Sequence, residues 1–141
     1  MVEKERILVA DREESVREMV SRIAIQMGHE ILTVKEGKEA LELLRKGSIT
    51  LLITDLEDPG LNGLEGMKSV RTEFPDLPIL CMASQDSSLP EIDAAASGVT
   101  DYITKPFTLD KMRAKLTWVI HEKNLVRDLT KKSIELERMI E

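Results

Sequence analysis

The sequence predicts an α/β fold: a doubly wound parallel sheet of five strands with helices on both faces. Five short apolar runs alternate with segments whose apolar residues recur at helical spacing, and this alternation is typical of βαβ units. The first and third runs are almost continuously apolar, as expected for central parallel strands buried on both faces. We expect right-handed crossovers between successive strands.

The first two units each combine a strand with an amphipathic helix. Strands are expected at 6–10 and 30–34. The helix after the first strand has a stripe of apolar residues: Val16, Met19, Val20, Ile23 and Met27. We expect it to end at Gly28, and the shorter second helix to end at Gly47, because glycine is the usual residue after a helix C-terminus.

The rest of the sheet is expected to follow the same order. Three further strands are predicted at 50–54, 78–83 and 101–105. The helix after the third strand is expected to end before Pro75. An alanine-rich helical segment, 89–97, is expected to end at Gly98.

The last helix is predicted to extend beyond the domain. No Gly or Pro occurs from Leu109 to the final residue, whereas a compact domain needs only about four turns. We therefore divide the chain into a domain, 1–122, and a helical extension, 123–141. The extension has its own apolar seam: Leu125, Val126, Leu129, Leu136, Met139 and Ile140. It is either a solvated tail or a coiled-coil arm that pairs two chains or leads to a missing output region.

Composition favours a soluble, cytoplasmic protein. The net charge of −6 argues against a general nucleic-acid surface, which needs clustered Lys and Arg. No apolar stretch approaches the roughly 18 residues that span a bilayer, and no signal-peptide pattern opens the chain. The single cysteine, Cys81, lies in the apolar run "PILCMA", so we expect a buried thiol rather than a reactive one.

Polar side chains are expected at the carboxyl ends of the strands, where open parallel sheets bind ligands. Asp11 follows the first strand, Asp55 the third, and Lys105 closes the fifth. Position alone leaves two roles open for Asp55. It is either a functional carboxylate that takes part in ligand binding or chemistry, or a residue that orders the following loop through its backbone amides. Lys105 is either solvated or, if it faces Asp55, suited to hold a phosphoryl oxygen. Its bond to Pro106 is a candidate for the cis isomer.

Four segments, in their order and spacing, resemble the response-regulator receiver domains of two-component signalling: "ILVADREESVREMV", "LLITDLEDPGLNGLEGM", "PILCMASQD" and "AAASGVTDYITKPF". The resemblance covers about residues 5 to 122 and implies a flavodoxin-like fold with strand order 2-1-3-4-5. It also implies that Asp55 accepts a phosphoryl group from a histidine kinase or phosphotransfer protein. Lys105 matches the family's invariant Lys, and Tyr102 its aromatic switch residue.

The resemblance further implies a Mg²⁺ ion held by two adjacent acids, the acceptor and the backbone carbonyl of Glu57. Such an ion wants oxygen ligands, and it offsets the repulsion between a carboxylate and an anionic phosphoryl donor. Here Arg12 replaces the second acid, so Mg²⁺ binding is in doubt. Asp11, Asp55 and Glu57 are the ligands that remain. Arg12 is itself suited to pair with Asp55 or with a phosphoryl group.

A second departure from the family concerns its switch hydroxyl. The family's spacing places it at Ala83, which has none, and the hydroxyl of Ser84 is expected on the opposite face of the strand. Two hypotheses stay open. The chain is either a working receiver phosphorylated on Asp55, or a pseudo-receiver that serves as an interaction or dimerisation module without phosphorylation.

We do not expect an enzyme. A haloacid-dehalogenase-type phosphatase needs a second Asp where Glu57 stands, and no Gly-rich phosphate loop or dinucleotide fingerprint is present. The expected partners are a histidine kinase or phosphotransfer protein and, through the last helix, a second copy of the chain. No DNA-binding domain or membrane segment is recognised in the 141 residues.

Overall fold

The computed structural model describes residues 4–56, 63–84 and 98–140. The predicted fourth helical segment, 89–97, therefore lies outside the described residues. The described elements are β1 (Arg6–Ala10), α1 (Glu14–Gln26), β2 (Glu30–Val34), α2 (Gly37–Lys46), β3 (Leu51–Asp55), α3 (Gly63–Glu73), β4 (Ile79–Ser84), β5 (Asp101–Lys105) and α5 (Leu109–Ile140).

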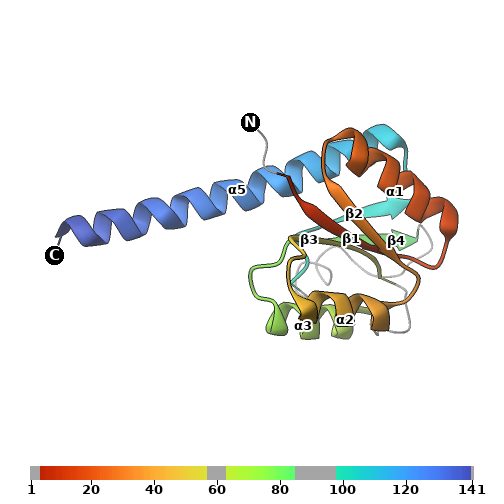
Figure 1. The fold of residues 1–141 in the computed structure, drawn as a ribbon, viewed down its shortest axis with the longest axis horizontal. Coiled ribbons are helices and arrows are strands. Elements are labelled where there is room, and N and C mark those ends of the chain that lie inside the picture. Colours follow the sequence, from red (N-terminus) through yellow and green to blue (C-terminus); the bar gives the residue numbers. More distant parts are fainter. Residues whose placement is uncertain (1–3, 57–62, 85–97, 141) are drawn as a thin grey trace.

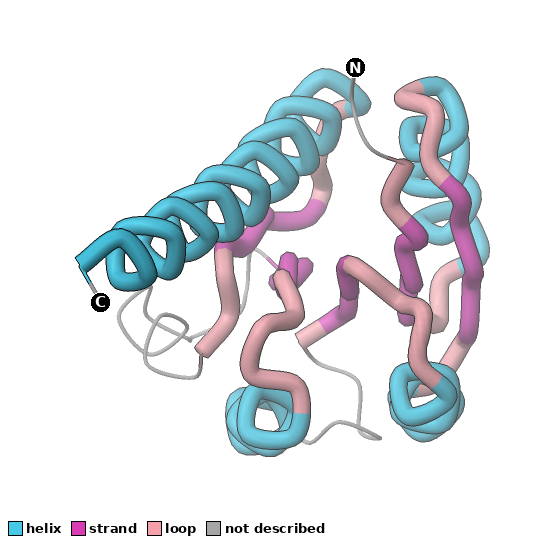
Figure 2. The backbone as a smooth tube through the Cα atoms, turned by 60° about the vertical axis from the view of Figure 1, so that its left-hand side comes forward, coloured by secondary structure: helices cyan, strands magenta, loops and turns pink. Residues whose placement is uncertain are grey.

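The strands form one parallel sheet in the order β2-β1-β3-β4-β5. Helices α1 and α5 cover one face of the sheet, and α2 and α3 cover the other (Figure 1). The same layers are visible in a rotated view of the backbone (Figure 2). The predicted doubly wound fold and its strand order are confirmed.

Two predicted strands are displaced by one residue. β3 runs over 51–55 rather than 50–54, and β4 runs over 79–84 rather than 78–83. Before β3, the hydroxyl of Thr50 accepts the Arg6 N–H at 2.8 Å in place of a backbone carbonyl. Before β4, Pro78 has no N–H to donate, and only its carbonyl pairs, with the N–H of Leu52. As a result Asp55 and Ser84 are the last residues of their strands.

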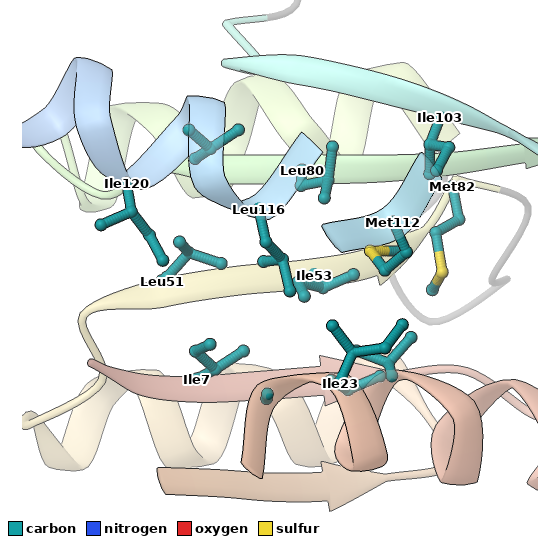
Figure 3. Close-up of a cluster of buried hydrophobic side chains, with 14 residues drawn as sticks. Ile7, Ile23, Leu51, Ile53, Leu80, Met82, Ile103, Met112, Leu116 and Ile120 are labelled. Atoms are coloured by element: carbon teal, nitrogen blue, oxygen red, sulfur yellow. The ribbon is translucent and has the colours of Figure 1, made fainter. Parts of the chain in front are cut away.

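The core consists of two apolar layers separated by the sheet. Alternate strand residues face opposite sides, so Ile7 and Val9 join one layer while Leu8 and Ala10 join the other. Figure 3 shows the layer under α1 and α5, whose labelled side chains are Ile7, Ile23, Leu51, Ile53, Leu80, Met82, Ile103, Met112, Leu116 and Ile120. Burial on both faces explains why β1 and β3 are almost wholly apolar in sequence.

In the part of the chain that the structure describes, the buried residues of α5 all lie in its first half. Its buried residues are Met112, Leu116, Val119 and Ile120. Further along, Lys123 forms an ion pair with Glu5, whose side chain is 1% exposed. Beyond that contact the helix projects away from the sheet (Figure 1). None of the helices in the described residues is long and apolar enough to cross a membrane.

Candidate functional site

Three of the predicted site residues meet at the carboxyl ends of the strands. Lys105, the last residue of β5, places its Nζ 2.6 Å from Asp11 Oδ2 and 3.5 Å from Asp55 Oδ2. Asp11 directly follows β1, and Asp55 ends β3. Parallel strands bring their carboxyl ends to one edge of the sheet, and β1, β3 and β5 each contribute one charged group there.

The Asp11 carboxylate is fully buried and uses both of its oxygens. Oδ1 accepts the backbone N–H of Glu13 at 2.8 Å, and Oδ2 accepts a hydrogen bond from Lys105 at 2.6 Å. The side chain is 0% exposed. Burial of a charge is tolerated only when it is paired and hydrogen-bonded. Asp11 therefore acts as an internal fixing point for Lys105 and for the loop that leads into α1.

Arg17, on the first turns of α1, also fixes this loop. Its Nη1 donates to the backbone carbonyls of Asp11 at 2.7 Å and Arg12 at 3.0 Å. Neither this role nor that of the Glu13 amide was predicted. An aspartate that accepts the N–H two residues later is a known turn pattern and was readable in "DRE", whereas the Arg17 contact depends on the path of the loop.

Asp55 is the more accessible of the two aspartates. Its side chain is 18% exposed, compared with 0% for Asp11. It pairs in register with Met82 of β4, and the next residue, Leu56, donates its N–H to the Met82 carbonyl. The backbone of Asp55 is thus held by the sheet while its carboxylate reaches the surface beside Lys105.

Lys105 remains a cation in this environment. Burial alone would lower its pKa, but the hydrogen bond to Asp11 and the negative charges of Asp55, Asp11 and Glu13 outweigh burial, so the pKa is raised. Glu13 Oε1 lies 3.8 Å from Nζ. The bond between Lys105 and Pro106, a candidate for the cis isomer from the sequence, is cis.

Arg12 lies at the surface beside this cluster. Its side chain is exposed, and within the described part of the chain it forms no hydrogen bond or ion pair, although its backbone carbonyl is held by Arg17. No three His, Cys, Asp or Glu side chains among the described residues are grouped so that they could hold a metal ion. Glu57 lies outside those residues.

The predicted switch positions lie on β4 and β5. Ala83 and Tyr102 are both partly buried and pack against the apolar layer under α2 and α3, to which Cys81 belongs. Lys115 of α5 places its Nζ 5.6 Å from the centre of the Tyr102 ring. Ser84 pairs in register with Lys105, so the hydroxyl-bearing residue ends the strand while the switch position itself holds a methyl group.

Comparison with known proteins agrees with this arrangement. The family model of the response regulator receiver domain matches residues 7–117. A chemotaxis protein CheY homolog of Campylobacter jejuni is 35% identical over 119 residues, which are 82% of this chain and 92% of that protein. The response regulator MprA of Mycobacterium ulcerans is 31% identical over 131 residues, 93% of this chain but 56% of that protein.

Solved structures share the fold. The chemotaxis response regulator CheY4 of Vibrio cholerae superposes with a TM-score of 0.75 at 29% identity, over 83% of this chain and 99% of CheY4. NtrX from Brucella abortus superposes with a TM-score of 0.84 at 25% identity, over 92% of this chain and 29% of NtrX. On the match to residues 7–117 and the 35% identical relative, the chain belongs to the family of response regulator receiver domains.

Proposed function

We propose that this chain is a phosphorelay receiver in which Asp55 accepts a phosphoryl group from a histidine kinase or a phosphotransfer protein. Receiver domains are signalling modules that interact with such donors and are generally not enzymes. The observation that carries the proposal is the Lys105 ammonium, which lies 3.5 Å from Oδ2 of the partly buried Asp55 while Asp11 fixes it from the other side.

The choice of Asp55 over Asp11 follows from access to solvent, because the Asp55 side chain is 18% exposed and that of Asp11 is 0% exposed. A carboxylate that attacks phosphorus needs an oxygen that a donor can reach. Asp11 is fully buried, and its two oxygens accept hydrogen bonds from Glu13 and Lys105. Asp55 reaches the surface at the end of β3. Asp11 is better suited to hold Lys105 in place.

Lys105 supplies the charge that the reaction needs. As an Asp55 oxygen bonds to phosphorus, the bond from phosphorus to the donor breaks and its electron pair leaves with the donor. Negative charge gathers on the phosphoryl oxygens during this transfer, and a fixed cation beside them lowers the barrier. The raised pKa of Lys105 keeps that cation present at neutral pH.

The test is phosphorylation by acetyl phosphate or by a cognate kinase, followed by intact mass. We expect phosphate on the wild type and none on Asp55→Asn. Asp76→Asn is the matched control, because Asp76 is an exposed aspartate near the opposite ends of the strands. Absence of phosphate on the wild type with both donors would overturn the proposal in favour of the pseudo-receiver, the alternative that Ala83 favours because it lacks the switch hydroxyl.

Magnesium does not fit the described residues of this site. Receiver domains typically bind Mg²⁺ in an acidic pocket. Here both Asp11 oxygens are already hydrogen-bonded, and Arg12 stands where a carboxylate ligand is expected. A cation at that position repels a divalent ion instead of binding it. We therefore propose no Mg²⁺-dependent step for this chain.

We also propose that residues 123–141 form an arm that pairs two chains. Val126, Leu129, Leu136 and Ile140 are all at least half exposed, and they occupy a and d positions of one heptad frame, with Ser133 at the remaining a position. Apolar a and d positions are buried by a partner helix in coiled coils. In a parallel pair this frame places Lys132 at g opposite Glu137 at e of the other chain, a complementary charge pair.

Sedimentation of the full chain and of a chain truncated after Glu122 tests the arm. We expect the full chain to be dimeric and the truncated chain monomeric. Equal monomeric masses for the two proteins would contradict the arm.

A further inference from the structure

We propose that Arg12 takes the place of the metal ion, and that its guanidinium binds the oxygens of the phosphoryl group during transfer to Asp55 without any divalent cation. The inference rests on the proposed function of Asp55. It assigns Arg12 a direct role in binding the phosphoryl group.

The loop after β1 holds the backbone of Arg12 in a fixed position. The Asp11 carboxylate accepts the Glu13 N–H at 2.8 Å, and Arg17 Nη1 donates to the backbone carbonyls of Asp11 and Arg12, which flank the Arg12 Cα, at 2.7 and 3.0 Å. Asp11 is itself tied to Lys105 at 2.6 Å. The backbone that carries Arg12 is therefore anchored to the same cluster that contains Asp55, while its side chain is exposed.

The charge balance of the site calls for a second cation. The Lys105 ammonium is shared by the carboxylates of Asp11, Asp55 and Glu13, which lie 2.6, 3.5 and 3.8 Å from it. Three acids around one ammonium leave net negative charge before the phosphoryl group arrives. A dianionic phosphoryl donor is repelled by that charge unless another cation approaches it.

Arg12 is the cation in this loop with an unused side chain. Lys105 is held by Asp11, and Arg17 donates to two backbone carbonyls. Over the ranges that the structure describes, the Arg12 guanidinium has no hydrogen bond or ion pair to give up. Arginine binds phosphate through two parallel N–H···O bonds, and it stays charged at any working pH. Arg12 therefore provides a positive charge and directed hydrogen bonds to the phosphoryl oxygens without a metal ion.

The chemical step balances without a co-reactant beyond the donor. With acetyl phosphate, an Asp55 oxygen forms the new P–O bond, the P–O bond to acetate breaks, and acetate leaves with the electron pair. Lys105 and Arg12 contact the phosphoryl oxygens and undergo no change of protonation.

The test compares acetyl phosphate labelling of Asp55 in Mg²⁺ and in EDTA. We expect the wild type to be labelled at similar rates in both. In EDTA, Arg12→Ala should slow labelling by about 10²-fold, the lower end of the effect of removing one such contact, since Arg12 is exposed. Arg12→Lys should recover part of the rate. Arg22→Ala, which removes an exposed arginine further along α1, should have no effect.

A direct binding measurement accompanies the rates. In calorimetric titration with MgCl₂ we expect no site in the wild type and a new site in Arg12→Asp, whose labelling should become Mg²⁺-dependent. Labelling of wild-type Asp55 only in Mg²⁺, or unchanged labelling of Arg12→Ala in EDTA, would overturn the role of Arg12 and leave Asp55 as the acceptor. Failure of Asp55 labelling in every protein, Arg12→Asp with Mg²⁺ included, would overturn the proposed function as well.

Discussion

Asp11 and Lys105 illustrate how a buried charge can organise a surface site. Asp11 has no contact with solvent, and among the residues that the structure describes its charge is compensated by the Lys105 ammonium and the Glu13 amide. The lysine is thereby held at the sheet edge with its ammonium directed toward Asp55 as well. Asp11, which we expect to take no part in the chemistry, thus sets the position of the residue that we propose contacts the phosphoryl group.

Lys105→Met should therefore destabilise the fold as well as abolish phosphorylation. The substitution leaves the Asp11 carboxylate buried without its cation, and we expect a loss of about 3 kcal/mol in the free energy of unfolding. Urea denaturation measures it. The double variant Asp11→Asn with Lys105→Met removes both charges and should recover most of the loss. If the double variant is no more stable than Lys105→Met, the pair does not contribute as described.

Cys81 should be unreactive in the folded protein. Burial, and next the negative charge of Asp55, raise the pKa of its thiol to about 12. The thiolate, which is the reactive form, is therefore almost absent at pH 8. We expect an aromatic disulfide reagent to label Cys81 only after addition of denaturant, with absorbance as the readout. Rapid labelling of the native chain would show that β4 opens readily.

The three charged site residues were predictable because each stands where an apolar strand ends. Asp11, Asp55 and Lys105 could be placed at one sheet edge from strand order and direction alone. The burial of Asp11 could not be predicted in this way, since it depends on Lys105 reaching across from β5, 94 residues away in sequence. The same holds for Arg17, whose contacts exist only once the loop has folded.

At the scale of elements, the strands were predicted to within one residue, and the errors have local causes. The β3 and β4 boundaries shifted because a Thr50 hydroxyl and a Pro78 ring take the place of ordinary backbone pairing. Gly28 and Gly47 follow α1 and α2 with φ of 89° and 86°, a conformation that glycine adopts without steric cost. Helix ends and apolar runs are local signals, which is why they were readable in the sequence.

The starts of β1 and β2 are joined by a buried histidine. His29 is 6% exposed, and its Nδ1 accepts the Glu5 N–H at 2.9 Å. Burial lowers the His29 pKa below 6.5, with opposing smaller effects from Glu5, which raises it, and Lys123, which lowers it. The ring is therefore neutral in the folded protein at neutral pH and accepts this bond through an unprotonated nitrogen.

This histidine should make stability depend on pH. Between the lowered pKa and 6.5 the unfolded chain binds more protons than the folded chain, so the free energy of unfolding should fall as pH falls through that window. His29→Asn keeps an acceptor near Nδ1 but cannot titrate, and it should flatten this part of the profile. His121→Asn, at an exposed position on α5, should not. Thermal unfolding across pH 5 to 8 measures both, and equal slopes for the wild type and His29→Asn would contradict the assignment.

At the scale of the whole molecule, α5 belongs to two environments. Its first turns complete the core, whereas the apolar residues of 123–141 lie exposed on a helix that leaves the domain (Figure 1). The length of this helix was predictable, because no Gly or Pro interrupts it. The sequence did not determine whether a second helix covers the apolar seam of 123–141. Helical spacing describes one chain, and pairing requires a second.

The heptad frame makes a sharper prediction than truncation. Leu136, at a d position, and Ile134, at a b position, are both exposed on the single chain, at 59% and 46%. In a parallel pair only Leu136 is buried, and a lysine there would place two charges inside the seam. We expect Leu136→Lys to be monomeric in sedimentation and Ile134→Lys to remain dimeric, with both helical by circular dichroism. Equal effects of the two substitutions would show that the arm pairs in another register or not at all, since the outer face of a coiled coil tolerates a charge that its seam does not.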